Sequence, residues 1–175
     1  MKICKLNLDI ADERWIANIA DIEKVSEQVK DTVFADVGAR GGLDFLPADK
    51  EVSVNVCLSD DEQVHTLNRD FRGMDKPTNV LSFANVDYRD FADESELFGS
   101  VELGDIIIAF ETMDKEAQIE SISLKNHYCH LLAHGLLHIL GFDHIEEDEA
   151  KVMEGYETEI LAQLGIENPY KDFCD

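Results

Sequence analysis

The chain has 175 residues with 38 acidic and 15 basic side chains, which gives a formal net charge of −23. Taken alone, this acidity argues against a nucleic-acid-binding protein, although a local basic cluster could still bind RNA. No apolar run is long enough to cross a membrane, and residues 1–15 do not have the composition of a signal peptide. We therefore expect a cytoplasmic protein without a membrane segment.

Apolar residues make up 45% of the chain, enough for a single domain over residues 1–175 with its own core. The four cysteines are scattered and form no Cys-x-x-Cys pair, so they suit neither a disulfide framework nor a zinc ribbon. Cys129 lies close to several histidines and could act as a ligand or nucleophile. Its position on an apolar helix favours a small buried hydrophobic side chain instead.

The first part of the chain predicts two strands and two helices. Alternating apolar residues predict strands at 2–10 and 51–58. Apolar residues at helical spacing predict one amphipathic helix from Trp15 to Val37, and a glycine-rich loop follows to residue 49. A second helix should begin after acidic capping residues near Asp60 and run to about Phe71.

The second part of the chain predicts two more strands and three helices. The strands are expected at 80–84 and 102–109, with an acidic flap at 85–99 between them; the helices are expected at about 110–119, from Ser121 or Ser123 to near 141, and 145–164. This order predicts a mixed α+β sheet with helices packed on it. The tail from about residue 166 is expected to be loosely ordered.

Residues 134–144, with the sequence HGLLHILGFDH, contain three of the six histidines. His134 and His138 are four residues apart and therefore lie on one face of a helix, where both imidazoles can reach one ion. Gly141 allows the chain to turn, which can bring His144 to the same ion. Three imidazoles with an open fourth position are typical of a catalytic zinc site.

Two alternatives concern the ligands themselves. These histidines could be ordinary helix residues without a ligand role, but their number and spacing favour a metal. His130 lies in the same stripe and competes for the place of third ligand. We favour His144, because a different direction of approach suits tetrahedral coordination better than three ligands in line.

The spacing also matches the metzincin protease motif H-E-x-x-H-x-x-G-x-x-H, with one departure. Gly135 occupies the position of the glutamate that serves as general base in those proteases. A peptidase would then need a base from elsewhere, such as Asp143 or a carboxylate of the flap. Asp143 fits better as a residue that orients a histidine or caps the turn.

The densest positive cluster in this acidic chain comprises Arg69, Arg72 and Lys76. These side chains could simply pair with neighbouring aspartates. They also lie in and beside a loop that leads into a strand, where an arginine can bind a phosphate with two hydrogen bonds. His65, on the preceding helix, has no other potential ligand at metal-binding spacing and is expected to be solvated or hydrogen-bonded.

Three segments in order resemble the YbeY family of zinc-dependent endoribonucleases, also called ribosomal RNA maturation factors. They are LNRDFR with KPTNVLSF within residues 67–83, LGDIII at 103–108, and the histidine motif at 134–144. The resemblance covers about residues 50–165. Asn79 stands where many members have aspartate, and Ala84 where many have proline.

The resemblance implies a zincin-like α+β fold with a mixed four-stranded sheet and one zinc ion on His134, His138 and His144. It also implies that Arg72 is a functional arginine. The implied activity is cleavage of single-stranded RNA in ribosomal RNA maturation and ribosome quality control, with ribosomal or ribosome-assembly proteins as partners. A zinc hydrolase of another class, such as a metalloprotease, and an assembly partner with structural zinc are the alternatives.

Overall fold

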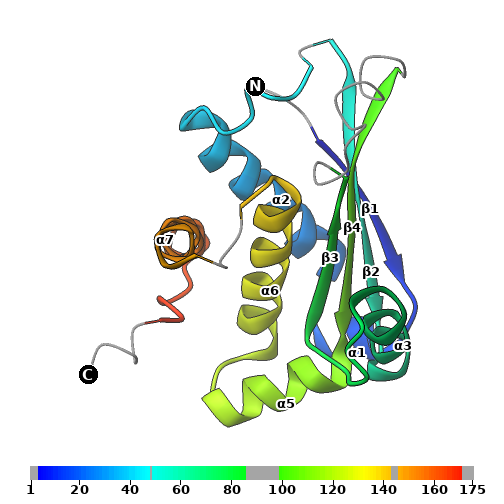
Figure 1. Cartoon of the computed structure of the whole chain (residues 1–175). Coiled ribbons are helices and arrows are strands. Elements are labelled where there is room, and N and C mark those ends of the chain that lie inside the picture. The colour runs from blue at the N-terminus through cyan, green and yellow to red at the C-terminus, as the bar shows by residue number, and fades with distance from the viewer. Residues whose placement is uncertain (1–3, 48, 86–98, 143–145, 171–175) are drawn as a thin grey trace.

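A computed structural model describes residues 4–47, 49–85, 99–142 and 146–170 (Figure 1). The strands are β1 (Cys4–Ile10), β2 (Glu51–Ser59), β3 (Val80–Ala84) and β4 (Ser100–Ala109). The helices are α1 (Arg14–Asn18), α2 (Ile22–Ala39), α3 (Asp61–Arg72), α5 (Phe110–Glu120), α6 (Leu124–Ile139) and α7 (Glu147–Gln163).

The four strands form one mixed sheet in the order β1-β2-β4-β3. β1, β2 and β4 run parallel to one another, and β3 pairs with β4 in the antiparallel direction. The predicted α+β fold with a mixed four-stranded sheet is thus confirmed. β3 forms one edge of the sheet and borders both α3 and α6.

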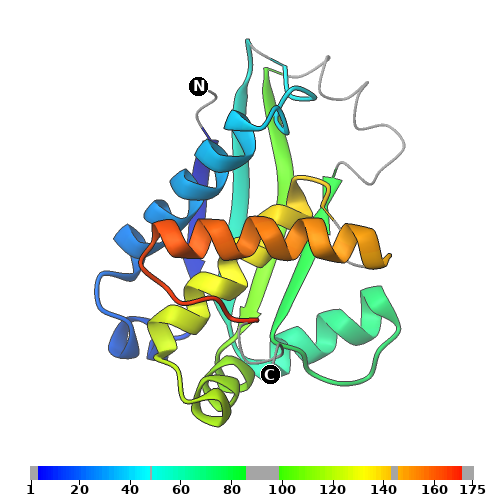
Figure 2. The same cartoon turned by 90° about the vertical axis from the view of Figure 1, so that its left-hand side faces the viewer.

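The helices cover the two faces of the sheet unequally. In Figure 1, α6 lies against one face and α3 lies beyond the other, while Figure 2 shows α7 crossing the outer side of α6. The alternation in β2 explains this arrangement, because Val52, Val54 and Val56 are buried on the helix side and Asn55 on the other side is partly exposed. The main core therefore lies between the sheet and the helices α2, α6 and α7.

The helix predicted from Trp15 to Val37 is wrong in one respect, because it is two helices. α1 ends at Asn18, and Asp21 has a left-handed φ of 54° before α2 begins. Trp15 and Ile19 are both buried, and the Trp15 Nε1–H donates to the Ser59 carbonyl oxygen at 2.9 Å. Apolar spacing continues across the break because both helices bury side chains in the same core, so the spacing alone did not reveal the turn.

Gly104 permits the close approach of β3 and β4. Its φ is +148°, and a Cβ atom at this position would lie 2.2 Å from the Phe83 carbonyl oxygen. No side chain fits there, because non-bonded carbon and oxygen atoms do not approach so closely. The glycine thus allows β3, which carries Ser82 and Phe83, to pair against β4.

No helix among the described residues is long and apolar enough to span a bilayer.

Candidate functional site

The helix α6 presents histidines on one side and leucines to the core on the other. Its start is fixed by Ser123, whose hydroxyl accepts a hydrogen bond from the Asn126 backbone N–H at 3.1 Å. Burial in the main core raises the pKa of the Cys129 thiol to about 11, and four leucines are buried in the same core: Leu131, Leu132, Leu136 and Leu137. This agrees with a packing role for Cys129 rather than a reactive one.

His134 and His138 point toward each other, as their spacing predicts. Their Nε2 atoms lie 3.1 Å apart and their ring centroids 4.6 Å apart. Two imidazole nitrogens on a tetrahedral zinc ion with bonds of 2.0–2.1 Å would be separated by about 3.3 Å. The pair therefore has the separation that a shared zinc ion requires.

Glu157, on α7, joins two of the α6 histidines. Its carboxylate accepts hydrogen bonds from His134 Nδ1 at 2.5 Å and from His130 Nε2 at 2.9 Å, and also from the Tyr170 hydroxyl. The residue is fully buried. Burial by itself would raise the pKa of Glu157, but the hydrogen bonds from His130 and His134 outweigh burial and lower this pKa to about 2.

His130, the alternative third ligand, has its Nε2 atom directed at Glu157. Its ring centroid is 6.5 Å from that of His134, compared with 4.6 Å between His134 and His138. The structure thus pairs His134 with His138 and brings His130 to the carboxylate. Sequence reasoning missed Glu157, although a charged residue on the inward face of α7, between Met153 and Ile160, could have indicated it.

Two residues of the predicted site, Asp143 and His144, lie outside the described residues, as does most of the predicted flap. Gly141 has a φ of +100°, which is the turn that the prediction requires after α6. Within residues 4–47, 49–85, 99–142 and 146–170, no group of three potential ligands gathers around one point. The ligand role of His144 therefore stays a prediction.

A buried histidine paired with a glutamate lies at the beginning of α6. His127 Nε2 is 2.9 Å from Glu116 Oε1, and the Asn79 amide donates to both oxygens of Glu116, at 3.1 and 3.2 Å. An aspartate at position 79 would place a second carboxylate against Glu116. The amide at this position therefore fits its surroundings and anchors the loop before β3.

Arg72 lies at the open edge of β3. Its Nη2 atom donates to the Ser82 carbonyl oxygen at 2.5 Å, and its guanidinium carbon is 4.9 Å from the centroid of the Phe83 ring. Arg69 behaves differently, because it forms an ion pair with Asp70 at 3.0 Å. Among the described residues, Arg72 is thus held by a backbone oxygen and an aromatic face, whereas Arg69 is held by a carboxylate.

Phe71 adds an aromatic surface beside Arg72. Its side chain is 69% exposed, and its ring packs edge-to-face on Phe83 with centroids 5.9 Å apart.

His65, on the same helix, forms a hydrogen bond with Asp75 at 2.7 Å, which is the hydrogen-bonded state that its isolation in the sequence suggested.

Gly135 shows how the histidine helix meets the strand that holds Arg72. A Cβ atom on Gly135 would lie 3.0 Å from Ile106 Cγ2 and 3.3 Å from the Ser82 hydroxyl. Ser82 thus contacts α6 with its side chain and Arg72 with its carbonyl oxygen. One residue of β3 separates the histidine helix from the arginine.

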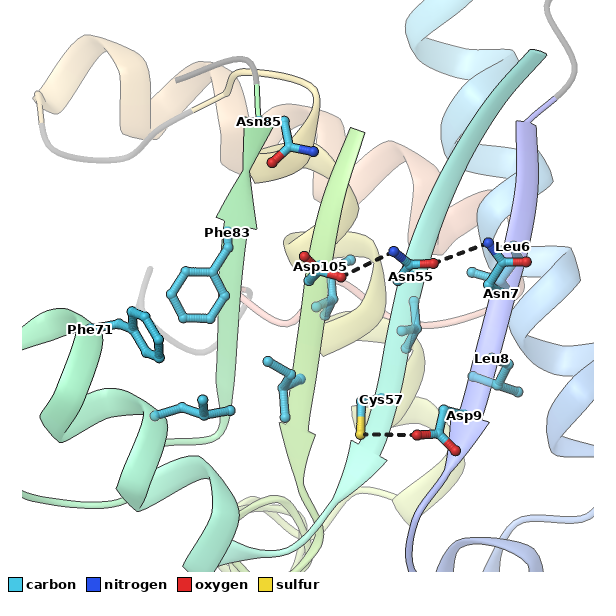
Figure 3. Close-up of a pocket in the computed structure, with 14 residues that line it drawn as sticks. Leu6, Asn7, Leu8, Asp9, Asn55, Cys57, Phe71, Phe83, Asn85 and Asp105 are labelled. Atoms are coloured by element: carbon cyan, nitrogen blue, oxygen red, sulfur yellow. Dashed lines mark hydrogen bonds between the residues drawn. The ribbon is translucent and has the colours of Figure 1, made fainter. Parts of the chain in front are cut away.

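A groove of about 810 Å³ lies on the sheet face opposite α6 (Figure 3). Its floor carries a hydrogen-bonded row in which Asn7 donates to Asn55 at 3.0 Å and Asn55 donates to Asp105 at 3.1 Å. Phe71 and Phe83 line one side of it. Neither His134 nor His138 is among the described residues that line the groove, so the groove is separate from this histidine pair.

Comparison with known proteins adds a family match. Residues 10–165 match the model of a family described as Endoribonuclease YbeY. Proteins of that name are similar to this chain: the one from Rhodospirillum rubrum is 41% identical over 96% of this chain and 82% of its own length, and the one from Bradyrhizobium diazoefficiens is 48% identical over 95% and 87%. The one from Zymomonas mobilis is 50% identical over 74% of each chain.

The fold also resembles a solved structure. The solution structure of TM1509 from Thermotoga maritima superposes with a TM-score of 0.52, covering 93% of this chain and 91% of the other. The two are 20% identical in sequence, so this likeness supports the fold alone.

Proposed function

Since the chain belongs to the YbeY family of endoribonucleases, we propose that it is a zinc-dependent endoribonuclease that cleaves single-stranded RNA. The observation that carries the zinc site is the 3.1 Å separation of His134 Nε2 and His138 Nε2. The proposed substrate is ribosomal RNA during its maturation and quality control in the cytoplasm. The proposed partners are ribosomal or ribosome-assembly proteins.

Each proposed role uses a side chain suited to it. His134 and His138, with His144 as third ligand, would hold one zinc ion and leave a position open. When bound, zinc supplies an acidified water and a Lewis acid that polarises a phosphoryl oxygen. Arg72 has donors beyond the one bonded to Ser82, so its guanidinium can bind the phosphate and stabilise the charge that develops during cleavage.

The surroundings of Arg72 support a single-stranded substrate. Phe71 is exposed and can stack on an unpaired base, whereas the bases of a duplex are already stacked on one another. The net charge of −23 opposes broad contact with a duplex backbone, but it leaves room for a short contact at one arginine. We therefore propose that Phe71 and Arg72 bind neighbouring parts of one RNA strand.

The packing of Gly135 disfavours the metalloprotease alternative. A glutamate there would have to fit where even a Cβ atom lies 3.0 Å from Ile106 and 3.3 Å from Ser82. This chain therefore lacks the general base of the metzincin motif, and a side chain at position 135 would require these neighbours to shift. Phosphodiester cleavage depends less on that base, because a cation such as Arg72 can stabilise the developing charge directly.

The test is metal analysis of the purified protein combined with cleavage assays on single-stranded and double-stranded RNA. We expect about one zinc ion per chain and preferential cleavage of the single strand. His138→Ala, purified in parallel to exclude a contaminating nuclease, should lack the activity. Full activity in that variant would contradict the proposal, and peptide cleavage without RNA cleavage would favour the protease alternative.

Thermal melts distinguish catalytic zinc from purely structural zinc. If zinc is structural, chelation and His144→Ala should both unfold the protein. If zinc is catalytic, both should abolish cleavage and leave a folded protein, because the core of the domain lies between the sheet and helices rather than around the histidines.

A further inference from the structure

We propose that Glu157 is a positioning residue for the metal site, and that Tyr170 from the C-terminal segment holds it in place. In this arrangement the carboxylate fixes the ring of His134 in the tautomer that can bind an ion through Nε2. The inference rests on the proposed function only in taking His134 and His138 as metal ligands. It assigns a role to Glu157, 23 positions after His134 on the helix α7, and to Tyr170, 36 positions after His134 in the segment that follows α7.

The tautomer follows from the chemistry of the partners. Glu157 is a carboxylate and can only accept hydrogen bonds, so the His134 Nδ1 atom, 2.5 Å from it, must carry a proton. In a neutral imidazole the other nitrogen, Nε2, then has no proton and can donate its lone pair to a metal. This Nε2 atom is the one that lies 3.1 Å from His138 Nε2.

The carboxylate itself is fixed from three sides. His134 Nδ1 contacts one oxygen, and His130 Nε2 and the Tyr170 hydroxyl both contact the other. A fully buried carboxylate with three donors has little freedom to rotate, so the plane of the His134 ring is fixed with it. His130, which its spacing made a rival ligand, acts here as a support for Glu157.

Charge gives the arrangement a second effect. A carboxylate behind a histidine ligand makes the imidazole a better donor and offsets part of the charge of a divalent ion. Glu157 is buried, so this attraction is weakly screened by water. Replacing the carboxylate by an amide of the same shape should therefore weaken zinc binding without removing any ligand.

The first measurement is zinc affinity, by competition with a chromogenic chelator, on the full-length chain. We expect Glu157→Gln to bind zinc about 10- to 100-fold more weakly than the wild type. Tyr170→Phe removes one hydroxyl from the carboxylate and should cost less, about 5-fold. Glu159→Gln is the matched control, because it makes the same change two residues away at an exposed side chain that pairs with Arg40.

The second measurement reads the tautomer directly. In the zinc-free protein, long-range ¹H–¹⁵N correlation spectra should show His134 protonated at Nδ1. In Glu157→Gln this tautomer should lose its dominance, and in Glu159→Gln it should persist. A role for Glu157 in stability alone would change the melting temperature and leave the tautomer of His134 as it is.

The outcomes separate this inference from the proposed function. If the wild type binds no zinc, the proposed metal site is wrong, whereas the tautomer measurement still tests Glu157. If the wild type binds zinc and both Glu157→Gln and Tyr170→Phe match its affinity within twofold, the positioning role is overturned. Should Glu157→Gln fail to fold, Tyr170→Phe decides, because it keeps the carboxylate and the core.

Discussion

The two sides of β3 differ in how far their side chains are buried and fixed. On one side, His134 and its partner Glu157 are held by short hydrogen bonds, and Glu157 is fully buried. On the other side, Arg72 and Phe71 lie at the edge of the sheet, and Phe71 is 69% exposed. A metal ion requires fixed distances and therefore a rigid, buried frame, whereas a polymer substrate requires surfaces that it can reach.

From this difference we predict that substitutions on the histidine side abolish RNA cleavage, whereas substitutions on the side of Arg72 and Phe71 reduce its rate. The largest effect is expected for His138→Ala, which removes one of the proposed ligands. RNA cleavage should fall on the order of 1,000-fold or more, because the remaining residues cannot acidify water. Metal content and single-turnover cleavage measure this loss. Without zinc, the free energy of unfolding of the variant should lie within about 1 kcal/mol of the wild-type value, because His138 is only partly buried.

Gly104→Ala should disturb the pairing of β3 with β4 and therefore affect both the histidine side and the Arg72 side of β3. The added Cβ would lie 2.2 Å from the Phe83 carbonyl oxygen, and alanine is strained at a φ of +148°. We expect a loss of about 2–4 kcal/mol in the free energy of unfolding, measured by urea titration. Gly155→Ala is a suitable control, because a Cβ there meets no atom within 4 Å. Equal stability of the two variants would show that the β3–β4 contact tolerates a side chain.

Arg72→Ala should change RNA cleavage without changing zinc binding, which would show that the two sides of β3 act independently. Cleavage should fall by about 10²–10³-fold, as for other donors that stabilise transition-state charge, while zinc affinity stays within twofold of the wild type. Arg72→Lys should recover only part of the rate, because an ammonium group lacks the planar pair of donors. Arg69→Ala serves as control, since Arg69 is already paired with Asp70. A large loss of zinc from Arg72→Ala would mean that the sides are not independent.

The smallest effect is expected for Phe71→Ala. Loss of a stacking surface should weaken binding of single-stranded RNA by about 1–3 kcal/mol and leave folding and zinc content unchanged. Fluorescence anisotropy with a short labelled RNA measures the affinity, and Phe71→Trp should restore it. Phe45→Ala is the control, because Phe45 is also an exposed aromatic residue but lies in the loop after α2. This variant should bind RNA with the affinity of the wild type.

Local patterns in the sequence determined most of the secondary structure and the placement of the two central predicted ligands. Alternation identified β2, and the spacing of four residues placed His134 and His138 on one face of α6, because both signals depend on residues close together in the chain. The same signals failed at Ile19–Asp21, where two helices bury apolar residues in one core and imitate a single period.

Only the tertiary structure decided what surrounds those two histidines. No periodic pattern in the sequence relates the residues that meet there. Examples are the order of the strands, the contact of Arg72 with Ser82 and the contact of Glu157 with His134. Packing selects such contacts from many that composition would allow, because they form only when distant segments are already in place. Spacing could therefore place His134 and His138 together as proposed metal ligands, but only folding could bring Glu157 of α7 and Tyr170 to them.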